Sequence, residues 1–361
     1  MPNTDPDQSS ARLRVRAARV RAAAGAAAAV AGLSLLAGGC GGSSVTTSNT
    51  AVTSSGSASG QKLHLAYFSF AEQNSYDAPM LASAQKAAAA ANAQVTVFDA
   101  NNNPQTQYSQ VQDAIATGSY AGFVIQPIDG AGLTSLVKEA IGKHIQAAAV
   151  SQVLGPDLQT PTPQVPGEAA SVVYVDVARG VRAGKLVEAA CANLQTSTCD
   201  VGYVYDQKAS GYDQGVRAGF DSVVSHDPKV KVVAEGQAFF TASGGLQAAQ
   251  TMLQARPDIN IMVGSDQGME GATSAIQNSG KKVLIVGIGG SVAGLNHVKN
   301  GTWFGDVVAL PATEGQVAVE DLVKAIRTGH HSGAVTVEAG LPNDGIATQK
   351  TVNEFTGEWA G

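Results

Sequence analysis

From Lys62 onward the sequence alternates short apolar runs with segments of helical periodicity, and this alternation restricts the fold more than any other feature. The runs LHLAYFS, QVTVFDA, AGFVIQP and IQAAAVS are typical of buried strands. A proline-rich stretch at 153–171 follows, and the alternation restarts with DVGYVYD, VKVVAEGQ, INIMVGS, KVLIVGIG and TWFGDVVA. Strands that alternate with helices of about 10–15 residues build parallel sheets from βαβ units. The pattern therefore predicts an α/β protein with two successive doubly wound parallel sheets.

The segments between these runs predict the helices. In the first half they read DAPMLASAQKAAAAAN, PQTQYSQVQDAIAT and GAGLTSLVKEAIGK. In the second half we expect helices at 177–194, 211–225, 243–255, 267–279, 291–299 and 312–328, and a last strand near GAVTVEAG. The proline-rich stretch predicts a surface loop near a junction between lobes. Because open parallel sheets bind ligands beyond the carboxyl ends of their strands, two such sheets can face each other across a ligand cleft.

The N-terminal residues predict export and lipidation. Five Arg between positions 12 and 21 precede an uncharged run from Ala22 to Ala37, and the sequence LAGGC ends at Cys40. The run is shorter than the roughly 20 residues of a membrane span, and the whole arrangement is typical of a secretory signal. LAGGC resembles a bacterial lipobox, although Ala37 stands where Leu is usual. We therefore expect a lipoprotein signal peptide at 1–39, an acylated Cys40 that anchors the protein to the outer face of the membrane, and a flexible, uncharged tether at 40–60.

The other two cysteines, Cys191 and Cys199, predict a structural disulfide, because bridges persist outside the cytoplasm. Two free thiols are the alternative. The spacing of Cys191 and Cys199 and the lack of a nearby His argue against a zinc site. No metal is therefore expected. The formal net charge is −6, and no stripe of Lys and Arg offers the phosphate neutralisation that nucleic acid requires.

No enzyme active site or cofactor site is expected. The glycines of GIGGSVAG, at 287–294, miss the spacing of a dinucleotide-binding loop. The six His include no metalloprotease pattern, and the sequence shows no acid–base constellation.

Six segments in order carry a resemblance to a known family. They are AEQNSYDAPMLASAQKAA, DANNNPQTQYSQVQDAIATG, GFVIQPIDGAGL, GVRAGFDSV, GSDQGMEGATSAIQNSGK and VLIVGIGGSVAGLNHVKNG. From about Lys62 to about Thr351 the chain resembles the ribose/galactose-type periplasmic sugar-binding proteins, which are the capturing subunits of ABC importers. The resemblance implies a type 1 periplasmic binding fold, in which two Rossmann-like lobes joined by a three-segment hinge close over one small ligand.

The resemblance also implies where the lobes divide. The crossings are expected near Asp176, near Ala309–Leu310 and near Glu338. The N-terminal lobe then comprises 61–176 with 310–338, and the C-terminal lobe comprises 177–309 with 339–361.

Eleven ligand-contacting residues are expected from the family pattern. A polar pair and a stacking aromatic follow the first strand, an amide ends the third, and a pair ends the fourth. The second lobe contributes three further positions to the ligand site. They are a residue before a helix, a second stacking aromatic and the end of the VGSD strand. These residues are Ser69, Asn74, Tyr76, Asp77, Gln126, Ser151, Gln152, Gln214, Phe240, Ser265 and Asp266.

Several family charges are absent from the sequence. Ser151 and Gln152 stand where the family has an acid and an arginine, Gly289 stands where many members have an acid, and Ala309 replaces a polar hinge residue. The cleft is therefore expected to retain aromatics and amides and to lose several charges, which suits a neutral polyol, a deoxy or modified sugar or a less hydroxylated ligand as well as ribose.

The expected function is extracytoplasmic capture of a small carbohydrate-like solute and its delivery, by a monomer, to an ABC permease with a cytoplasmic ATPase. A sensory receptor of the same fold is the first alternative, and a secreted α/β enzyme the second. A DNA-binding regulator is disfavoured, because the chain begins with an export signal rather than a helix-turn-helix.

Overall fold

The computed structural model describes residues 60–194 and 196–361. The predicted signal peptide, the predicted lipidation site Cys40 and the tether up to residue 59 lie outside the described residues. Within the described part, no helix combines the length and the apolar character that a bilayer span requires.

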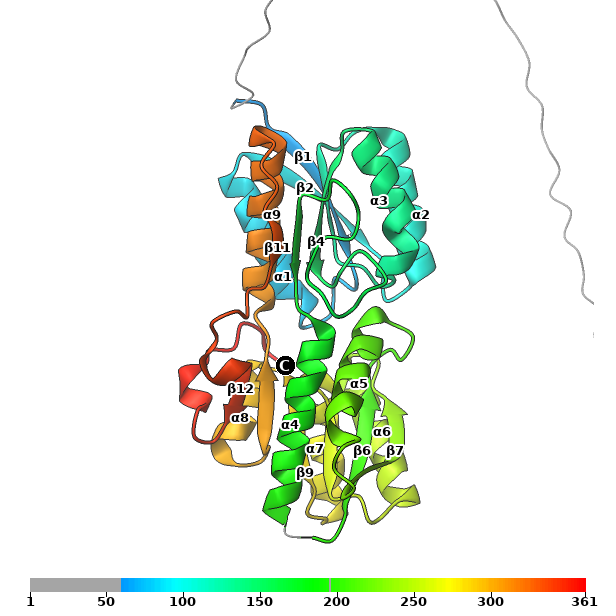
Figure 1. Cartoon of the computed structure of the whole chain (residues 1–361), viewed down its shortest axis with the longest axis vertical. Coiled ribbons are helices and arrows are strands. Elements are labelled where there is room, and N and C mark those ends of the chain that lie inside the picture. Colours follow the sequence, from blue (N-terminus) through cyan, green and yellow to red (C-terminus); the bar gives the residue numbers. More distant parts are fainter. Residues whose placement is uncertain (1–59, 195) are drawn as a thin grey trace, which may run out of the picture. The chain divides into compact units, whose positions relative to one another are not determined.

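The described chain forms an N-terminal sheet and a C-terminal sheet of six strands each, with helices on both faces of each sheet (Figure 1). Both sheets are parallel except for one edge strand, so the predicted fold class is confirmed. The strand orders are β11-β5-β4-β3-β1-β2 and β12-β10-β9-β8-β6-β7. In each sheet the order reverses at one strand, β1 in the first and β6 in the second, and the crevice beside such a switch point is where parallel sheets bind ligands.

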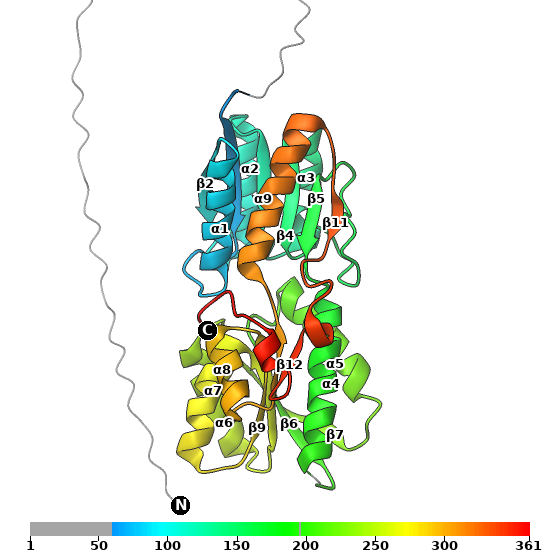
Figure 2. The same ribbon diagram turned by 90° about the vertical axis from the view of Figure 1, so that its left-hand side faces the viewer.

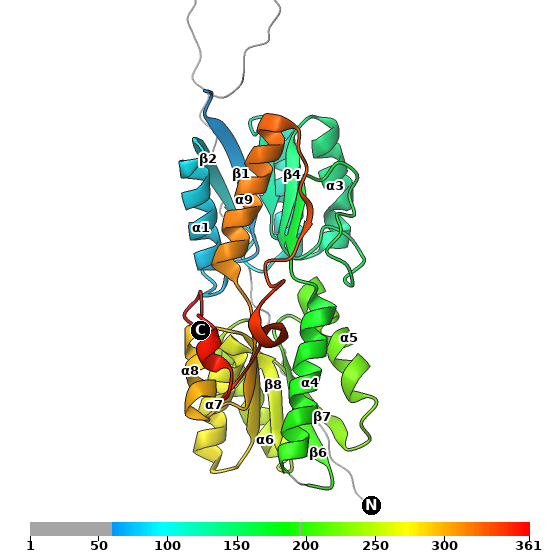
Figure 3. The same ribbon diagram turned by 60° about the vertical axis from the view of Figure 1, so that its left-hand side comes forward.

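The strands of the N-terminal sheet are β1 (Leu63–Ser69), β2 (Ala93–Asp99), β3 (Gly122–Ile125), β4 (Gln146–Ser151), β5 (Ala170–Val173) and β11 (Gly333–Val335). Its helices are α1 (Asp77–Ala90), α2 (Pro104–Thr117), α3 (Gly130–Gly142) and α9 (Pro311–Thr328). Helices α1 and α9 pack on one face and α2 and α3 on the other, as Figures 2 and 3 show.

The strands of the C-terminal sheet are β6 (Cys199–Tyr205), β7 (Val230–Gln237), β8 (Ile261–Ser265), β9 (Leu284–Gly289), β10 (Gly305–Val308) and β12 (Ile346–Thr348). Its helices are α4 (Asp176–Leu194), α5 (Gly211–Val224), α6 (Ala242–Ala255), α7 (Asp266–Ser279) and α8 (Val292–Asn300). Two short 3-10 helices, η1 (Pro342–Gly345) and η2 (Val352–Glu354), flank β12.

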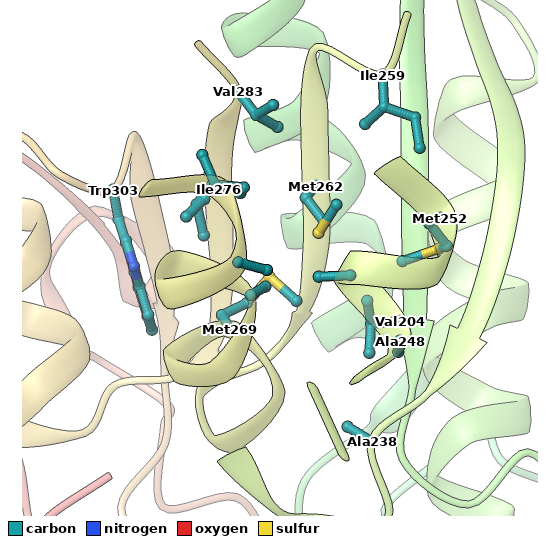
Figure 4. Packing of buried hydrophobic residues seen from close by; sticks show 14 of the residues in the cluster. Val204, Ala238, Ala248, Met252, Ile259, Met262, Met269, Ile276, Val283 and Trp303 are labelled. Atoms are coloured by element: carbon teal, nitrogen blue, oxygen red, sulfur yellow. The ribbon is translucent and has the colours of Figure 1, made fainter. Parts of the chain in front are cut away.

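The C-terminal sheet also separates two apolar layers. Helices α4 and α5 cover one face. Helices α6, α7 and α8 cover the other, where Met252, Met262 and Met269 pack with aliphatic side chains and Trp303 closes one side (Figure 4). Methionine and alanine supply much of this layer, because few aromatics are present in the sequence.

Local sequence signals place the helix ends. At six helices a Ser, Thr, Asp or Asn side chain accepts a hydrogen bond from the amide three residues on, which satisfies a donor that the helix leaves free. The capping residues are Asn103, Asp129, Ser210, Thr241, Ser265 and Ser291. Left-handed glycines end four helices, at Gly118, Gly280, Gly301 and Gly329.

Two strands were missed by the sequence analysis. Strand β5 has four residues and directly follows the proline-rich loop, and β12 has three residues and pairs antiparallel with β10. Both are too short for an alternating pattern to appear in the sequence. Strand β5 forms because β4 and β11 supply its hydrogen-bonding partners.

The chain passes between the sheets three times: from β5 to α4, from β10 to α9, and from β11 to β12. The predicted crossings near Asp176, Ala309–Leu310 and Glu338 fall in these connections. The assignment of lobes to exact residue bounds stays a prediction.

The loop before β5 carries a buried acid that makes stability depend on pH. Burial raises the pKa of Glu168 to about 8. Its two side-chain oxygens have no hydrogen-bond partner among the described residues. The pKa of Glu168 is higher in the folded protein than in the unfolded chain. The stability that Glu168 contributes is therefore fully present below about pH 4.5 and is lost as pH rises through about 8.

We expect Glu168→Gln to raise the thermal midpoint at pH 9 by several degrees and to leave it nearly unchanged at pH 5. Thermal unfolding of both proteins across this range measures the difference, with the exposed Glu139→Gln as control. A difference that does not vary with pH would contradict the assignment.

Candidate ligand-binding site

A cavity of about 40 Å³ lies where strand ends of both sheets come together. The N-terminal sheet contributes residues that follow β1, β3 and β4, and the C-terminal sheet contributes the ends of β8 and β9. The lining residues are Phe70, Asn74, Tyr76, Asp77, Gln126, Ser151, Gln152, Arg179, Tyr212, Phe240, Ser265, Gln267, Ile288 and Trp359. A more open cavity of about 620 Å³ adjoins it and shares Asn74, Phe240 and Gln267.

Asp77 and Gln126 form a buried polar pair on the N-terminal side. Gln126 Nε2 donates to Asp77 Oδ1 at 2.6 Å, and Gln126 Oε1 accepts from the amide of Phe70 at 3.2 Å. Burial raises the pKa of Asp77 to about 7, and the Gln126 amide opposes that rise. Both ends of the Gln126 amide are therefore used within the protein, so this side chain orients its neighbours as much as it offers contacts.

Asn74 links the two sides of the cavity. Its Oδ1 accepts from the amide of Tyr76 at 2.8 Å, which fixes the turn that leads into α1. The same oxygen accepts from Gln267 Nε2, in α7 of the C-terminal sheet, at 3.1 Å. This hydrogen bond joins elements that belong to different sheets.

The end of β4 presents strained backbone and an unsatisfied amide. Ser151 has φ 67°, in the left-handed region that non-glycine residues rarely adopt. Gln152 Oε1 is buried, and it has no hydrogen-bond partner in the described structure. Strain and unmet hydrogen bonds of this kind cluster at binding sites.

Aromatic side chains enclose the cavity from two directions. Phe240, whose φ is 54°, lies edge-on to Phe70 with ring centroids 5.5 Å apart, and Tyr212 lies 5.9 Å from it. Tyr76 and Trp359 form a second edge-on pair at 5.3 Å. The negative face of an aromatic ring is the surface that packs against the C–H groups of a sugar ring.

Arg179, in the first turn of α4, supplies a buried cation that the sequence analysis missed. Its guanidinium lies 3.9 Å from the centroid of the Tyr174 ring and 5.6 Å from that of Tyr212. Nε and Nη2 are buried and are unpaired within residues 60–194 and 196–361. The end of β4 carries no charge, as expected, and α4 brings to the cavity a cation that the expected contacts did not include.

Acidic groups surround this cation. Tyr76 Oη donates to Glu314 Oε2 at 3.5 Å, while burial raises the pKa of Glu314 well above its usual range and Arg179 opposes that rise. Burial likewise raises the pKa of Asp176 to about 8, again opposed by Arg179. With pKa values raised this far, both acids hold their protons near neutral pH, so Arg179 lies beside largely uncharged carboxyl groups.

Eight of the eleven predicted contacts line the cavity: Asn74, Tyr76, Asp77, Gln126, Ser151, Gln152, Phe240 and Ser265. The other three do not. Ser69 is fully buried in β1, Gln214 is exposed on α5, and Asp266 is fully buried at the start of α7.

Each of these three misplacements has a local reason. The Ser69 side chain is fully buried, because Ser69 is the last residue of β1 and the cavity lining begins at the next residue, Phe70. Gln214 Nε2 instead donates to the Ala209 carbonyl at 3.0 Å. Asp266 accepts from the amide of Ser291 at 2.7 Å and lies beside Asp306, so it fixes the loop after β9.

Sequence reasoning also missed Phe70, Tyr212, Gln267, Ile288 and Trp359. Phe70 and Gln267 are next to residues that it selected, so a wider window would have found them. Arg179 is three residues past the predicted crossing at Asp176, which was a usable signal. Trp359 lies beyond the segment that carries the resemblance, and its position is set only by the tertiary structure.

Cys191 and Cys199 are joined by a disulfide with Cα atoms 5.6 Å apart, between the end of α4 and β6. No group of three or more His, Cys, Asp or Glu side chains suited to a metal ion occurs in the described part of the chain.

Comparison with known proteins gives one family match. The family model described as a periplasmic binding protein domain matches residues 65–330. The ribose import binding protein RbsB of Bacillus subtilis is 25% identical over 227 residues, which are 63% of this chain and 69% of that protein. The xylitol-binding protein of Mycolicibacterium smegmatis is 27% identical over 221 residues, 60% of this chain and 59% of that protein.

Solved structures share the fold. A protein from Mycobacterium smegmatis in complex with β-D-fucofuranose superposes with a TM-score of 0.70 at 21% identity, covering 81% of this chain and 93% of its own. At this level of identity the similarity shows the arrangement of the two sheets.

Proposed function

The chain belongs to the periplasmic binding protein family, and from this premise we propose that it captures a neutral sugar or polyol between its two lobes. One observation carries the proposal. Unpaired donors of Arg179 and the unpaired acceptor of Gln152 belong to side chains that line the same cavity. A hydroxyl group both donates and accepts, so a polyhydroxylated ligand can satisfy both.

A neutral ligand can use the donors of Arg179 without bringing a second charge into the cavity. The nearby acids Asp176 and Glu314 have raised pKa values and are largely protonated near neutral pH. A carboxylate on the ligand would have to give up its water in this buried setting, which is costly. Hydroxyl groups would accept hydrogen bonds from Arg179 without adding charge.

The aromatic walls support the same ligand class. Tyr76 and Phe240 approach the cavity from opposite sheets, and each is braced by a second ring. Two such walls can hold the apolar faces of a ring or a folded polyol while polar groups bond its edge. The relatives are named for ribose and xylitol, and the similar structure holds a furanose, which agrees with this class.

We further propose transport as the role. Ligand contacts from both lobes would select the closed form, which would dock on an ABC permease driven by a cytoplasmic ATPase. Acylation of Cys40 would hold the protein at the outer face of the membrane. The relatives are named as binding proteins, which supports capture rather than catalysis.

A thermal-shift screen tests the ligand class. The purified protein is heated with D-ribose, D-arabinose, D-galactose, xylitol and myo-inositol, and with the uronic and aldonic acids of the three sugars. A neutral compound at a hundredfold excess over its Kd should stabilise the protein by about 2.7 kcal/mol. Stabilisation by the acids alone would overturn the proposed neutral ligand, and no response to any compound would overturn the sugar assignment.

Tyr76→Ala and Phe240→Ala are each expected to lower the affinity for the compound found in this screen at least tenfold, because each removes one wall of the cavity. Calorimetric titration measures the change. Tyr108→Ala is the matched control, because Tyr108 is partly buried on α2 away from the cavity, and its affinity should stay within threefold. Equal affinities in all three variants would mean that neither Tyr76 nor Phe240 contacts the ligand.

A further inference from the structure

The C-terminal segment, residues 355–361, supplies one wall of the cavity through Trp359. This side chain is 3% exposed and lines the cavity. Its indole Nε1 donates to the carbonyl oxygen of Gly289, at the end of β9, at 2.9 Å. Its ring meets Tyr76, which leads into α1 on the N-terminal side, with interplanar angle 80°. Trp359 therefore touches elements of both sheets.

The backbone of the segment is anchored on α8. The carbonyl oxygens of Trp359 and Ala360 accept from the amides of Val292 and Ala293 at 2.8 and 3.0 Å. These amides are in the first turn of α8, where the helix itself offers no acceptors. Figures 2 and 3 both place the C-terminus beside α8, at the level between the two sheets.

A second anchor lies on the N-terminal side. The Glu358 carboxylate accepts hydrogen bonds from the amide of Thr313, at 2.9 Å, and from its hydroxyl. Thr313 is in the first turn of α9, where the helix dipole favours an anion. With one anchor on α8 and the other on α9, the segment holds Trp359 in a fixed position at the cavity.

Gly289 makes room for the indole. A Cβ atom at this position would lie 2.5 Å from Cζ2 of Trp359 and 2.8 Å from Cγ of Asp266. Both distances are far below a normal contact, so any side chain at 289 would displace the indole. Glycine at 289 and tryptophan at 359 therefore fit each other.

This wall of the cavity is apolar. The indole N–H of Trp359 is already bonded to Gly289, and the neighbouring lining residue Ile288 has no polar side-chain atom. Ser265 lies beside Ile288 in the sheet, but its hydroxyl already donates to Asp206 Oδ1 at 2.8 Å. The unpaired polar groups of Gln152 and Arg179 come instead from the residue after β4 and from α4. A ligand hydroxyl buried against the Trp359 wall would lose its water partners and gain no replacement there.

We propose that Trp359 contacts the ligand and determines specificity, selecting a sugar or polyol that presents C–H or methyl groups rather than a hydroxyl to this wall. The proposal rests on the proposed function and adds to it the chemistry of one side of the ligand.

Single-tryptophan variants test the contact, because the sequence has only two tryptophans. Trp303→Phe leaves Trp359 as the sole emitter. Trp359→Phe leaves Trp303, which is buried in the apolar layer of Figure 4 and donates to Thr273 Oγ1 at 2.8 Å. Each variant is titrated with the sugar or polyol that binds the wild type most tightly among D-ribose, D-arabinose, D-galactose and xylitol.

We expect the ligand to change the fluorescence of Trp303→Phe and to protect it from acrylamide, and to leave that of Trp359→Phe unchanged. The proposal would be overturned if only Trp359→Phe changed its fluorescence on ligand addition. It would also be overturned if Trp303→Phe showed no fluorescence change while calorimetry still detected binding. Far-ultraviolet circular dichroism checks that both variants are folded.

Deoxy derivatives test the specificity. The same four compounds are compared with their monodeoxy derivatives, among them D-fucose beside D-galactose, on wild type and on Trp359→Ala. At least one derivative should bind the wild type tenfold more tightly than its parent, and Trp359→Ala should reduce that preference below threefold. If no derivative is preferred, or if Trp359→Ala keeps the wild-type ratio, the specificity role is rejected.

The two proposals fail differently. If the wild type binds none of the parent compounds or derivatives, the sugar or polyol assignment falls and the role of Trp359 falls with it. If the wild type binds them and the Trp359 variants behave as wild type, the assignment stands and only the role of Trp359 is rejected.

Discussion

Replacing Arg179 with Met is expected to reduce the affinity for a neutral sugar or polyol at least a hundredfold, which corresponds to about 2.7 kcal/mol. The guanidinium has buried, unpaired donors at the cavity, and Met removes them while keeping much of the volume. It also leaves the buried Glu314 without the cation that offsets its burial. Calorimetric titration against the compound found in the thermal-shift screen measures the loss.

Two further variants make this result interpretable. Arg179→Lys keeps the charge but lacks the planar fork, so its affinity should lie between those of Arg179→Met and the wild type. Arg217→Met removes an arginine of α5 that pairs with Asp221 and Glu235 outside the cavity, and it should bind within threefold of the wild type. Wild-type affinity in a folded Arg179→Met variant would exclude Arg179 from recognition.

Gly180→Ala and Gly219→Ala are each expected to lower the free energy of unfolding by at least about 2 kcal/mol. These glycines let α4 and α5 approach closely. A Cβ at Gly180 would lie 1.9 Å from the Val216 carbonyl oxygen, and a Cβ at Gly219 would lie 1.9 Å from that of Val177. Backbone atoms cannot move aside cheaply, so the helices would have to separate and expose the layer beneath them.

Gly142→Ala is the matched control. This glycine is the last residue of α3, and a Cβ there would meet nothing within 4 Å. The substitution should stabilise the protein by about 0.5 kcal/mol, because alanine restricts the unfolded chain. Thermal and urea unfolding of the three variants give the comparison. Equal stabilities would mean that the α4–α5 contact tolerates a methyl group.

The two glycine positions also show how far sequence reasoning reaches. The run VARGVRAGK contains Gly180 and Gly184 four residues apart, within a helix that the sequence predicted at nearly its observed bounds. The spacing indicates a close approach on one helix face. It does not identify α5 as the partner, because Gly215 and Gly219 are distant in sequence and meet α4 only in the folded protein.

The candidate site also has residues that the sequence could indicate and residues that it could not. Asn74, Tyr76, Gln126, Ser151 and Ser265 were expected from the family resemblance, and they follow or end strands whose carboxyl ends converge. Asp266 shows the limit of this rule. It directly follows β8, yet its side chain is directed into the packing beside Asp306 and away from the cavity, because the loop after β9 needs an acceptor for the Ser291 amide.

The sequence by itself determined the class of fold, the number of sheets, most helix ends and a majority of the cavity residues. Hydrophobic periodicity, caps and strand ends are local properties, so a linear pattern records them. The tertiary structure alone decided that Arg179 restores a charge to the cavity and that Trp359 closes one of its walls. Both depend on contacts between distant segments. The side chain of Arg179, from α4, lines the same cavity as Ser151 at the end of β4, and the last residues of the chain lie between the first turns of α8 and α9. Such contacts depend on how whole layers of helices and strands pack, and no short stretch of sequence contains that information.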